Sequence, residues 1–241
     1  MNVACIVLGG TVGLIKRGPL SLTNQTFFKA VLGAFTAYCG LHLTWGGLNG
    51  SFPQILKQLG ILIAALALGK IVGRLLHLQK MSNRLGQFAR EKMATARPDN
   101  PRRFNDGFNV CSVLFCAAPL GMLGALSEGL TTSGGATGYF YPLIIKAVMD
   151  GLAAMSFVVL FGPGVMLSAV PVMAFQGSIT LLASRVLQPF LLAHGLVDPV
   201  AATAGLLIFC VALIIFEIKK IEVADYLPSL IFAPLFTFLL R

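Results

Sequence analysis

Long apolar runs are the feature that most constrains how this chain of 241 residues can fold. Hydrophobic residues make up 56% of the sequence and charged residues only 11%, which is more apolar surface than one soluble core can bury. Runs of about 20 apolar residues match the length that an α-helix needs to cross a bilayer. The sequence therefore predicts an all-α fold, a polytopic transmembrane helical bundle surrounded by the lipid bilayer.

The runs predict about eight spans, and most reach the length that crossing requires. Their ranges are 2–15, 27–46, 58–77, 107–126, 139–161, 164–185, 199–217 and 224–240. The first run is short, because a helix of its length rises only about 21 Å against about 30 Å of hydrocarbon. Either this helix enters the protein as a partial span or a few residues precede it. No charged leader typical of a signal peptide stands before it.

Basic residues gather in three connectors that lie on one side of the membrane if there are eight spans. They are Lys16 and Arg17, then Lys80, Arg84, Arg90, Lys92, Arg97, Arg102 and Arg103, and finally Lys219 and Lys220. The positive-inside rule assigns that side to the cytoplasm and both termini to the outside. The opposite side carries little charge, with Lys57, Arg185 and Arg241. We read the net charge of +9 as this topology signal and expect no nucleic-acid partner, because no aromatic residues interleave the basic ones.

The polar segment 78–106, with its prolines in "ARPDNPRRFNDG", divides the chain. It predicts an N-terminal bundle of three spans over 1–77, a basic cytoplasmic loop over 78–106, and a C-terminal bundle of five spans over 107–241. The segments "LGGTVGLI" from Leu8 and "LGKIVGRL" from Leu68 share four residues in register. They indicate either an internal repeat, as in many transporters, or two glycine faces on which helices pack closely.

Lys146 and Asp150 place two charges inside an apolar run, at a depth close to the bilayer midplane. Their four-residue spacing puts them on one helix face, where they can pair directly. The preceding span carries Asn109 and Ser112 before Pro119, and the following span carries Gln176 and Thr180 after Pro171. Proline frees backbone carbonyls, so we expect two broken helices near these polar residues.

Two interpretations of these residues stay open. In the first they form a binding site for a solute or ion, built from Lys146, Asp150, Gln176, Asn109, Ser112 and Thr180. In the second, Lys146 and Asp150 are only an ion pair that fixes helix orientation. Under that reading Asn109 and Ser112 make ordinary hydrogen bonds between helices.

Enzyme chemistry finds little support in the sequence. Phosphate-binding loops and the His-Glu-x-x-His motif are absent, and no histidine lies at a depth where it could activate Ser112 or Ser168. The five cysteines stand inside apolar runs without ligand spacing. We therefore expect no catalytic residues, no cofactor and no metal.

Several segments together resemble the bacterial membrane family known as domain of unknown function 554, the YqgA-like and YdfK-like proteins. The resemblance runs over nearly the whole chain. It is carried by Asn2 with "LGGTVGL", by Leu114-Phe115-Cys116, Glu128-Gly129, Lys146, Asp150 and Gln176, and by Lys219-Lys220. The chain departs from the family at "TSGGATGYF" in an outer loop and at Glu217, where a small or apolar residue is usual. The resemblance implies a protein of the bacterial cytoplasmic (inner) membrane and supplies no activity.

The residues favour a secondary transporter of a small polar solute or ion, with its site at Lys146, Asp150 and Gln176. In this hypothesis Lys146 attracts an anionic or carbonyl-bearing solute, and Asp150 accepts a proton or cation that couples transport. The alternatives are a membrane regulator or assembly partner that acts through the basic loop, and an ion channel. Self-association is compatible with each of them.

Overall fold

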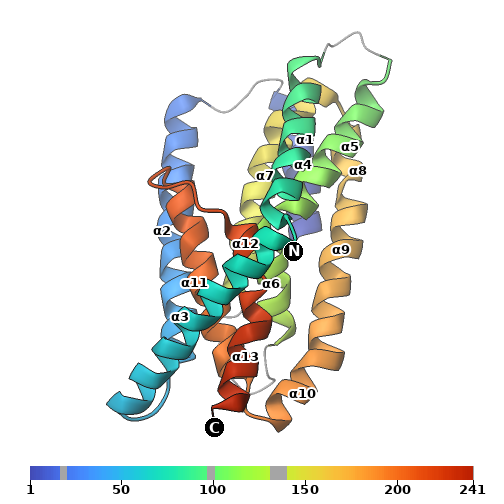
Figure 1. Cartoon of the computed structure of the whole chain (residues 1–241). Coiled ribbons are helices and arrows are strands. Elements are labelled where there is room, and N and C mark those ends of the chain that lie inside the picture. The colour runs from blue at the N-terminus through green and yellow to red at the C-terminus, as the bar shows by residue number, and fades with distance from the viewer. Residues whose placement is uncertain (17–20, 97–100, 131–139, 241) are drawn as a thin grey trace.

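A computed structural model describes residues 1–16, 21–96, 101–130 and 140–240, and the regular elements in these ranges are all helical. They form an elongated bundle (Figure 1), which confirms the predicted all-α fold. The helices are α1 (Asn2–Lys16), α2 (Leu22–Gly46), α3 (Phe52–Leu75), α4 (Leu78–Ala94), α5 (Arg103–Ala117), α6 (Pro119–Gly129), α7 (Tyr141–Phe161), α8 (Gly164–Leu167), α9 (Ala169–Leu182), a π-helical turn (Ala183–Leu187), α10 (Gln188–Ala193), α11 (Val197–Ile215), α12 (Val223–Tyr226) and α13 (Ser229–Leu239).

The predicted count of about eight spans is not confirmed. Four helical segments of the described chain are long and apolar enough to cross a membrane: α3, α7, the segment Gly164–Ala193, and α11. The bent pair of α5 and α6 would make a fifth. Helix α1 and the segment Val223–Leu239 are apolar but shorter, so the expectation of a short first helix holds.

The segment predicted as a basic loop is largely a helix, because residues 78–94 form α4. Apolar residues recur along it at Leu78, Met81, Leu85 and Phe88, a spacing typical of an amphipathic helix that its low hydropathy concealed. The start of α4 is stabilised by a residue that is far away in the sequence. The carboxylate of Asp225 accepts a hydrogen bond of 2.8 Å from the backbone N–H of Gln79.

Glycines allow the helices of the first half to pack closely on those of the second. A Cβ atom on Gly9 would lie 2.0 Å from the carbonyl oxygen of Gly151 in α7. In the same way, a Cβ on Gly73 of α3 would lie 2.0 Å from the carbonyl oxygen of Asp225. Both glycine segments are therefore close-approach faces, but α1 runs parallel to its partner and α3 antiparallel.

Lys16 ends α1 and Arg103 begins α5, so basic residues from two of the predicted connectors lie at one end of the bundle. Helices α1 and α4 end, and α5 begins, at one end of the bundle, whereas α3 begins and α13 ends at the other (Figure 1). Lys57 near the start of α3 donates a hydrogen bond of 2.6 Å to the carbonyl of Leu240 at that second end. Which end faces the cytoplasm stays a prediction. Arg17, Arg97, Arg241 and residues 131–139, which the sequence predicts as an outer loop, fall outside the described residues.

The turn between α7 and α8 is fixed by glycine and arginine. Gly162 adopts a φ of 74°, a left-handed conformation that favours glycine, and closes α7 through a hydrogen bond of 2.8 Å to Val158. The guanidinium of Arg103 donates bonds of 2.6 Å to the carbonyl oxygens of Val159 and Leu160. These contacts satisfy carbonyls that the last turn of α7 would leave without a partner.

Candidate functional site

The ion pair of Lys146 and Asp150 lies near the middle of α7, a helix of 21 residues. Asp150 is nine residues beyond the start of the helix, a rise of about 14 Å. The ammonium of Lys146 donates to Oδ2 of Asp150, as their spacing on one helix face favours. Lys146 is 2% exposed and Asp150 is 5% exposed. The pair is thus enclosed by protein at a depth where charge is costly.

Asn2 joins this pair from the first turn of α1. Its side-chain nitrogen donates a hydrogen bond of 2.9 Å to Oδ2 of Asp150 and another of 3.1 Å to Oε1 of Gln176 in α9. The parallel packing of α1 along the second half of α7 holds Asn2 at this depth. Three helices therefore contribute to one polar cluster, which we define as Asn2, Lys146, Asp150 and Gln176.

Two atoms of the polar cluster are left without a hydrogen-bond partner among the described residues. They are the oxygen Oδ1 of Asn2 and the nitrogen Nε2 of Gln176, and both are buried. An unpartnered buried polar group costs about 1–3 kcal/mol. The cluster thus offers one free acceptor and one free donor beside an ion pair, which is a capacity to bind a further polar group.

The break between α5 and α6 brings a narrow turn against the polar cluster. The two helices are bent by 57° at Ala118, which is extended, and Pro119 then opens α6. Gly121 in that first turn leaves room for the cluster, because a Cβ there would lie 3.1 Å from Nε2 of Gln176 and 3.4 Å from Cε of Lys146. The ring of Phe115 faces the ammonium of Lys146, with 5.5 Å between the nitrogen and the ring centroid.

The second predicted break is milder than expected. The segment Gly164–Ala193 remains one long span, with a local interruption at Ser168 between α8 and α9. Pro171 lies in the first turn of α9, where the absence of its N–H removes no helical hydrogen bond. The hydroxyl of Ser168 donates a bond of 2.6 Å to Val165 and so satisfies a carbonyl at the interruption.

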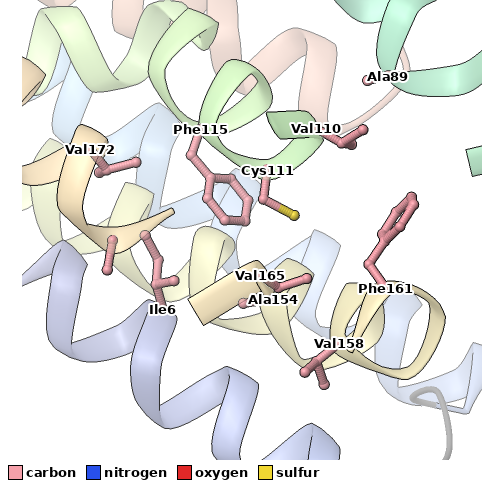
Figure 2. Packing of buried hydrophobic residues seen from close by; sticks show 11 residues of the cluster. Ile6, Ala89, Val110, Cys111, Phe115, Ala154, Val158, Phe161, Val165 and Val172 are labelled. Atoms are coloured by element: carbon pink, nitrogen blue, oxygen red, sulfur yellow. The ribbon is translucent and has the colours of Figure 1, made fainter. Parts of the chain in front are cut away.

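An apolar core lies next to the polar cluster. Ile6 of α1, Phe115 of α5 and Val172 of α9 belong to this core, which Figure 2 shows from close by. Asn2 lies one turn before Ile6, and Gln176 lies one turn after Val172. The core therefore continues directly into the cluster and limits the access of water, which strengthens the electrostatic interactions inside.

Three of the predicted site residues do not join the polar cluster. Ser112 donates to the carbonyl of Phe108 in its own helix at 2.6 Å. Thr180 donates to the carbonyl of Ala125 at 3.1 Å, one turn further along α9 than Gln176. In the part of the chain that the structure describes, Asn109 makes no hydrogen bond to the cluster. Lys146, Asp150 and Gln176 do lie together.

Asn2 was not predicted as a site residue. Two signals in the sequence pointed to Asn2. It belongs to the opening motif of the resembled family, and it lies about two helical turns before Gly9 on the same face of the predicted helix. As to metals, the residues described contain no group of three or more His, Cys, Asp or Glu side chains that could hold an ion.

Comparisons with known proteins cover the whole length of the chain. A family model described as a protein of unknown function (DUF554) matches residues 1–238. The uncharacterized membrane protein YdfK of Bacillus subtilis (strain 168) is 25% identical over 241 residues, covering 100% of this chain and 95% of that protein. The uncharacterized protein YqgA of Escherichia coli (strain K12) is 26% identical over 234 residues, covering 97% of this chain and 92% of that protein. No solved structure matches.

Proposed function

We propose that this chain, which belongs to the DUF554 family of proteins of unknown function, is a secondary transporter of a small polar solute or ion. The observation that carries the proposal is the polar cluster, a buried ion pair with one free donor and one free acceptor at mid-depth in a membrane protein. Ionisable residues at this depth are expensive and mark solute or ion pathways. Broken and short helices that meet at the midplane are the usual surroundings of transporter sites.

The contacts of Asp150 suggest how solute and proton binding are coupled in this proposal. Its Oδ2 atom accepts bonds from both Lys146 and Asn2. A proton or cation bound by Asp150 weakens the ion pair between Asp150 and Lys146. The ammonium of Lys146 then donates a hydrogen bond to an oxygen of the solute. Nε2 of Gln176 supplies a second donor to the solute, and Oδ1 of Asn2 supplies an acceptor. Proton and solute therefore bind together.

A role as a regulator or assembly partner is the second candidate, because α4 exposes an apolar edge. Met81 is 58% exposed and Phe88 is 38% exposed, and both lie among basic residues of the same helix. Such a surface suits a cytoplasmic protein or an anionic membrane surface. Recovery of a stable partner through α4 together with an inert polar cluster would favour this role over transport.

Proton-coupled uptake tests the transport proposal. The purified protein in proteoliposomes is given an inward proton gradient and screened with small acids, amino acids and ions, while internal pH is followed with a dye. We expect one solute class to drive proton entry, and Asp150→Asn to abolish this coupling. Asp198→Asn, at an exposed carboxylate of α11, is the matched control and should transport normally. Equal coupling in wild type and Asp150→Asn would contradict the proposed role of Asp150.

The orientation is a separate prediction. Single cysteines introduced into a cysteine-free background should react with an impermeant maleimide added to intact cells when they lie in 47–54 or 131–138. Cysteines at 85–100 should stay protected, because we expect this segment on the cytoplasmic side. Labelling of 85–100 from outside would reverse the orientation.

A further inference from the structure

A second polar site lies away from the polar cluster, between α3, α4, α11 and the segment that joins α11 to α12. It is a cavity of about 620 Å³ with a basic rim and an apolar wall. Lys70, Lys219 and Lys220 supply the basic groups, and Glu222 is the acidic residue that lines it. The cationic groups thus outnumber the anionic ones by two, so the cavity favours a ligand with negative charge.

The wall of this basic cavity is apolar where α3 and α11 approach each other. Leu66 of α3 and Leu206, Leu207 and Cys210 of α11 line it. These helices are two of the segments with the length and composition of membrane spans. The apolar wall of the cavity therefore belongs to the membrane-spanning part of the bundle. The long side chains of the lysines can place their charged ends near the membrane–water interface.

The rim of the basic cavity is held in place by contacts between α4 and α12. The side chain of Gln79 donates to Oδ1 of Asn83 at 3.0 Å and accepts a bond of 3.2 Å from the backbone N–H of Ala224. Lys70 stands over the ring of Tyr226, with 5.3 Å between its nitrogen and the ring centroid. Lys70 and Gln79 are thus held in place by contacts within the protein before any ligand binds, which lowers the cost of binding.

We propose that the basic cavity binds the headgroup of an anionic phospholipid. The phosphate accepts hydrogen bonds from Lys70, Lys219 and Lys220, and the glycerol end with the first methylene groups packs on the leucine wall of α3 and α11. A soluble phosphate would use the lysines but not the wall. Basic pockets between membrane helices recognise anionic lipid headgroups in this way. The inference is independent of transport through the polar cluster.

Native mass spectrometry of the purified full chain tests this site. Phosphatidylglycerol and phosphatidylcholine with identical acyl chains are titrated separately, and bound lipid is counted. We expect wild type to prefer phosphatidylglycerol, and Lys70→Gln/Lys219→Gln/Lys220→Gln to lose about tenfold in affinity for it while phosphatidylcholine binding is unchanged. The control Lys16→Gln/Lys57→Gln/Arg185→Gln removes the same charge from exposed positions that do not line the cavity and should keep the preference.

Other results would overturn the lipid site. Equal binding of the two lipids by wild type would do so, as would an equal loss in the control variant. Displacement of phosphatidylglycerol by millimolar inorganic phosphate would identify a soluble phosphate as the ligand instead. If the melting temperature shows that the triple variant is unfolded, the double variant Lys219→Gln/Lys220→Gln takes its place. It retains the contact of Lys70 with Tyr226 and should still lose most of the preference for phosphatidylglycerol.

Discussion

Lys146→Met should destabilise the protein by about 3–5 kcal/mol, because it leaves the carboxylate of Asp150 buried without its cationic partner. Asp150 is 5% exposed, so little water reaches its carboxylate to replace the ammonium. Asn2 still donates to Oδ2 of Asp150, but a single neutral donor does not balance a buried charge. The free energy of unfolding, measured by titration with dodecyl sulfate in mixed micelles, gives the size of the loss.

Lys146→Met/Asp150→Leu should recover most of that stability. Replacing both partners of a buried pair with apolar residues of similar volume is often neutral or stabilising, because no charge remains to be desolvated. The remaining cost is the contact of Asn2 with Asp150, since Asn2 keeps only its bond to Gln176. A double variant less stable than Lys146→Met would show that the two charges do not act as a pair.

Gly9→Ala should separate α1 from α7 and so disturb the polar cluster without touching it. The added methyl group would lie 2.0 Å from the carbonyl oxygen of Gly151, which is backbone and cannot rotate away. Overpacking of this kind costs about 1–3 kcal/mol. Displacement of α1 also withdraws Asn2 from Asp150, so we expect solute binding to fall with stability. Unfolding titrations and solute-induced shifts in melting temperature measure the two effects.

Gly177→Ala is the matched control for Gly9→Ala. Gly177 lies next to Gln176 in α9, but a Cβ there would meet open space. Replacing a helical glycine with alanine stabilises by about 0.5–1 kcal/mol. Gly177→Ala should therefore keep solute binding and be as stable as wild type or more so. Equal behaviour of the two variants would contradict the role assigned to close packing of α1 on α7.

The parts of the fold that the sequence predicts depend on local chemistry. The apolar runs have membrane-helix composition, Pro119 removes a backbone donor, and Lys146 and Asp150 are one turn apart on one helix. Each of these properties acts within a few residues, so the helices, the break between α5 and α6, and the ion pair follow from it. The helix α4 was missed because it is polar and because its start is capped by Asp225, 146 residues away along the chain.

The membership of the polar cluster depends on tertiary packing, which spacing does not determine. Asn2 and Asp150 are 148 residues apart and meet only because glycines seat α1 against α7. Ser112 and Thr180 fall at suitable helical intervals, yet nearby carbonyls already accept their hydroxyl protons. Helical periodicity shows which residues share a face but not which neighbouring helix covers that face.

Glu217 shows how a departure from the resembled family is accommodated. Its carboxylate pairs with Lys29 of α2 at 2.6 Å, and both side chains are exposed. The hydrogen bond from Lys29 and its positive charge lower the pKa of Glu217 below the usual value. An exposed pair of this kind contributes little to stability, so the contact explains how the acid is tolerated rather than why it is needed.

Solute-driven proton uptake by Lys146→Met/Asp150→Leu, with its fold verified by melting temperature, tests the central claim most directly. If the polar cluster is the transport site, the double variant is folded and takes up neither solute nor protons. If the charges only orient α7, it transports as wild type does. A folded double variant with the wild-type rate would contradict the transport site and leave Lys146 and Asp150 as a structural ion pair.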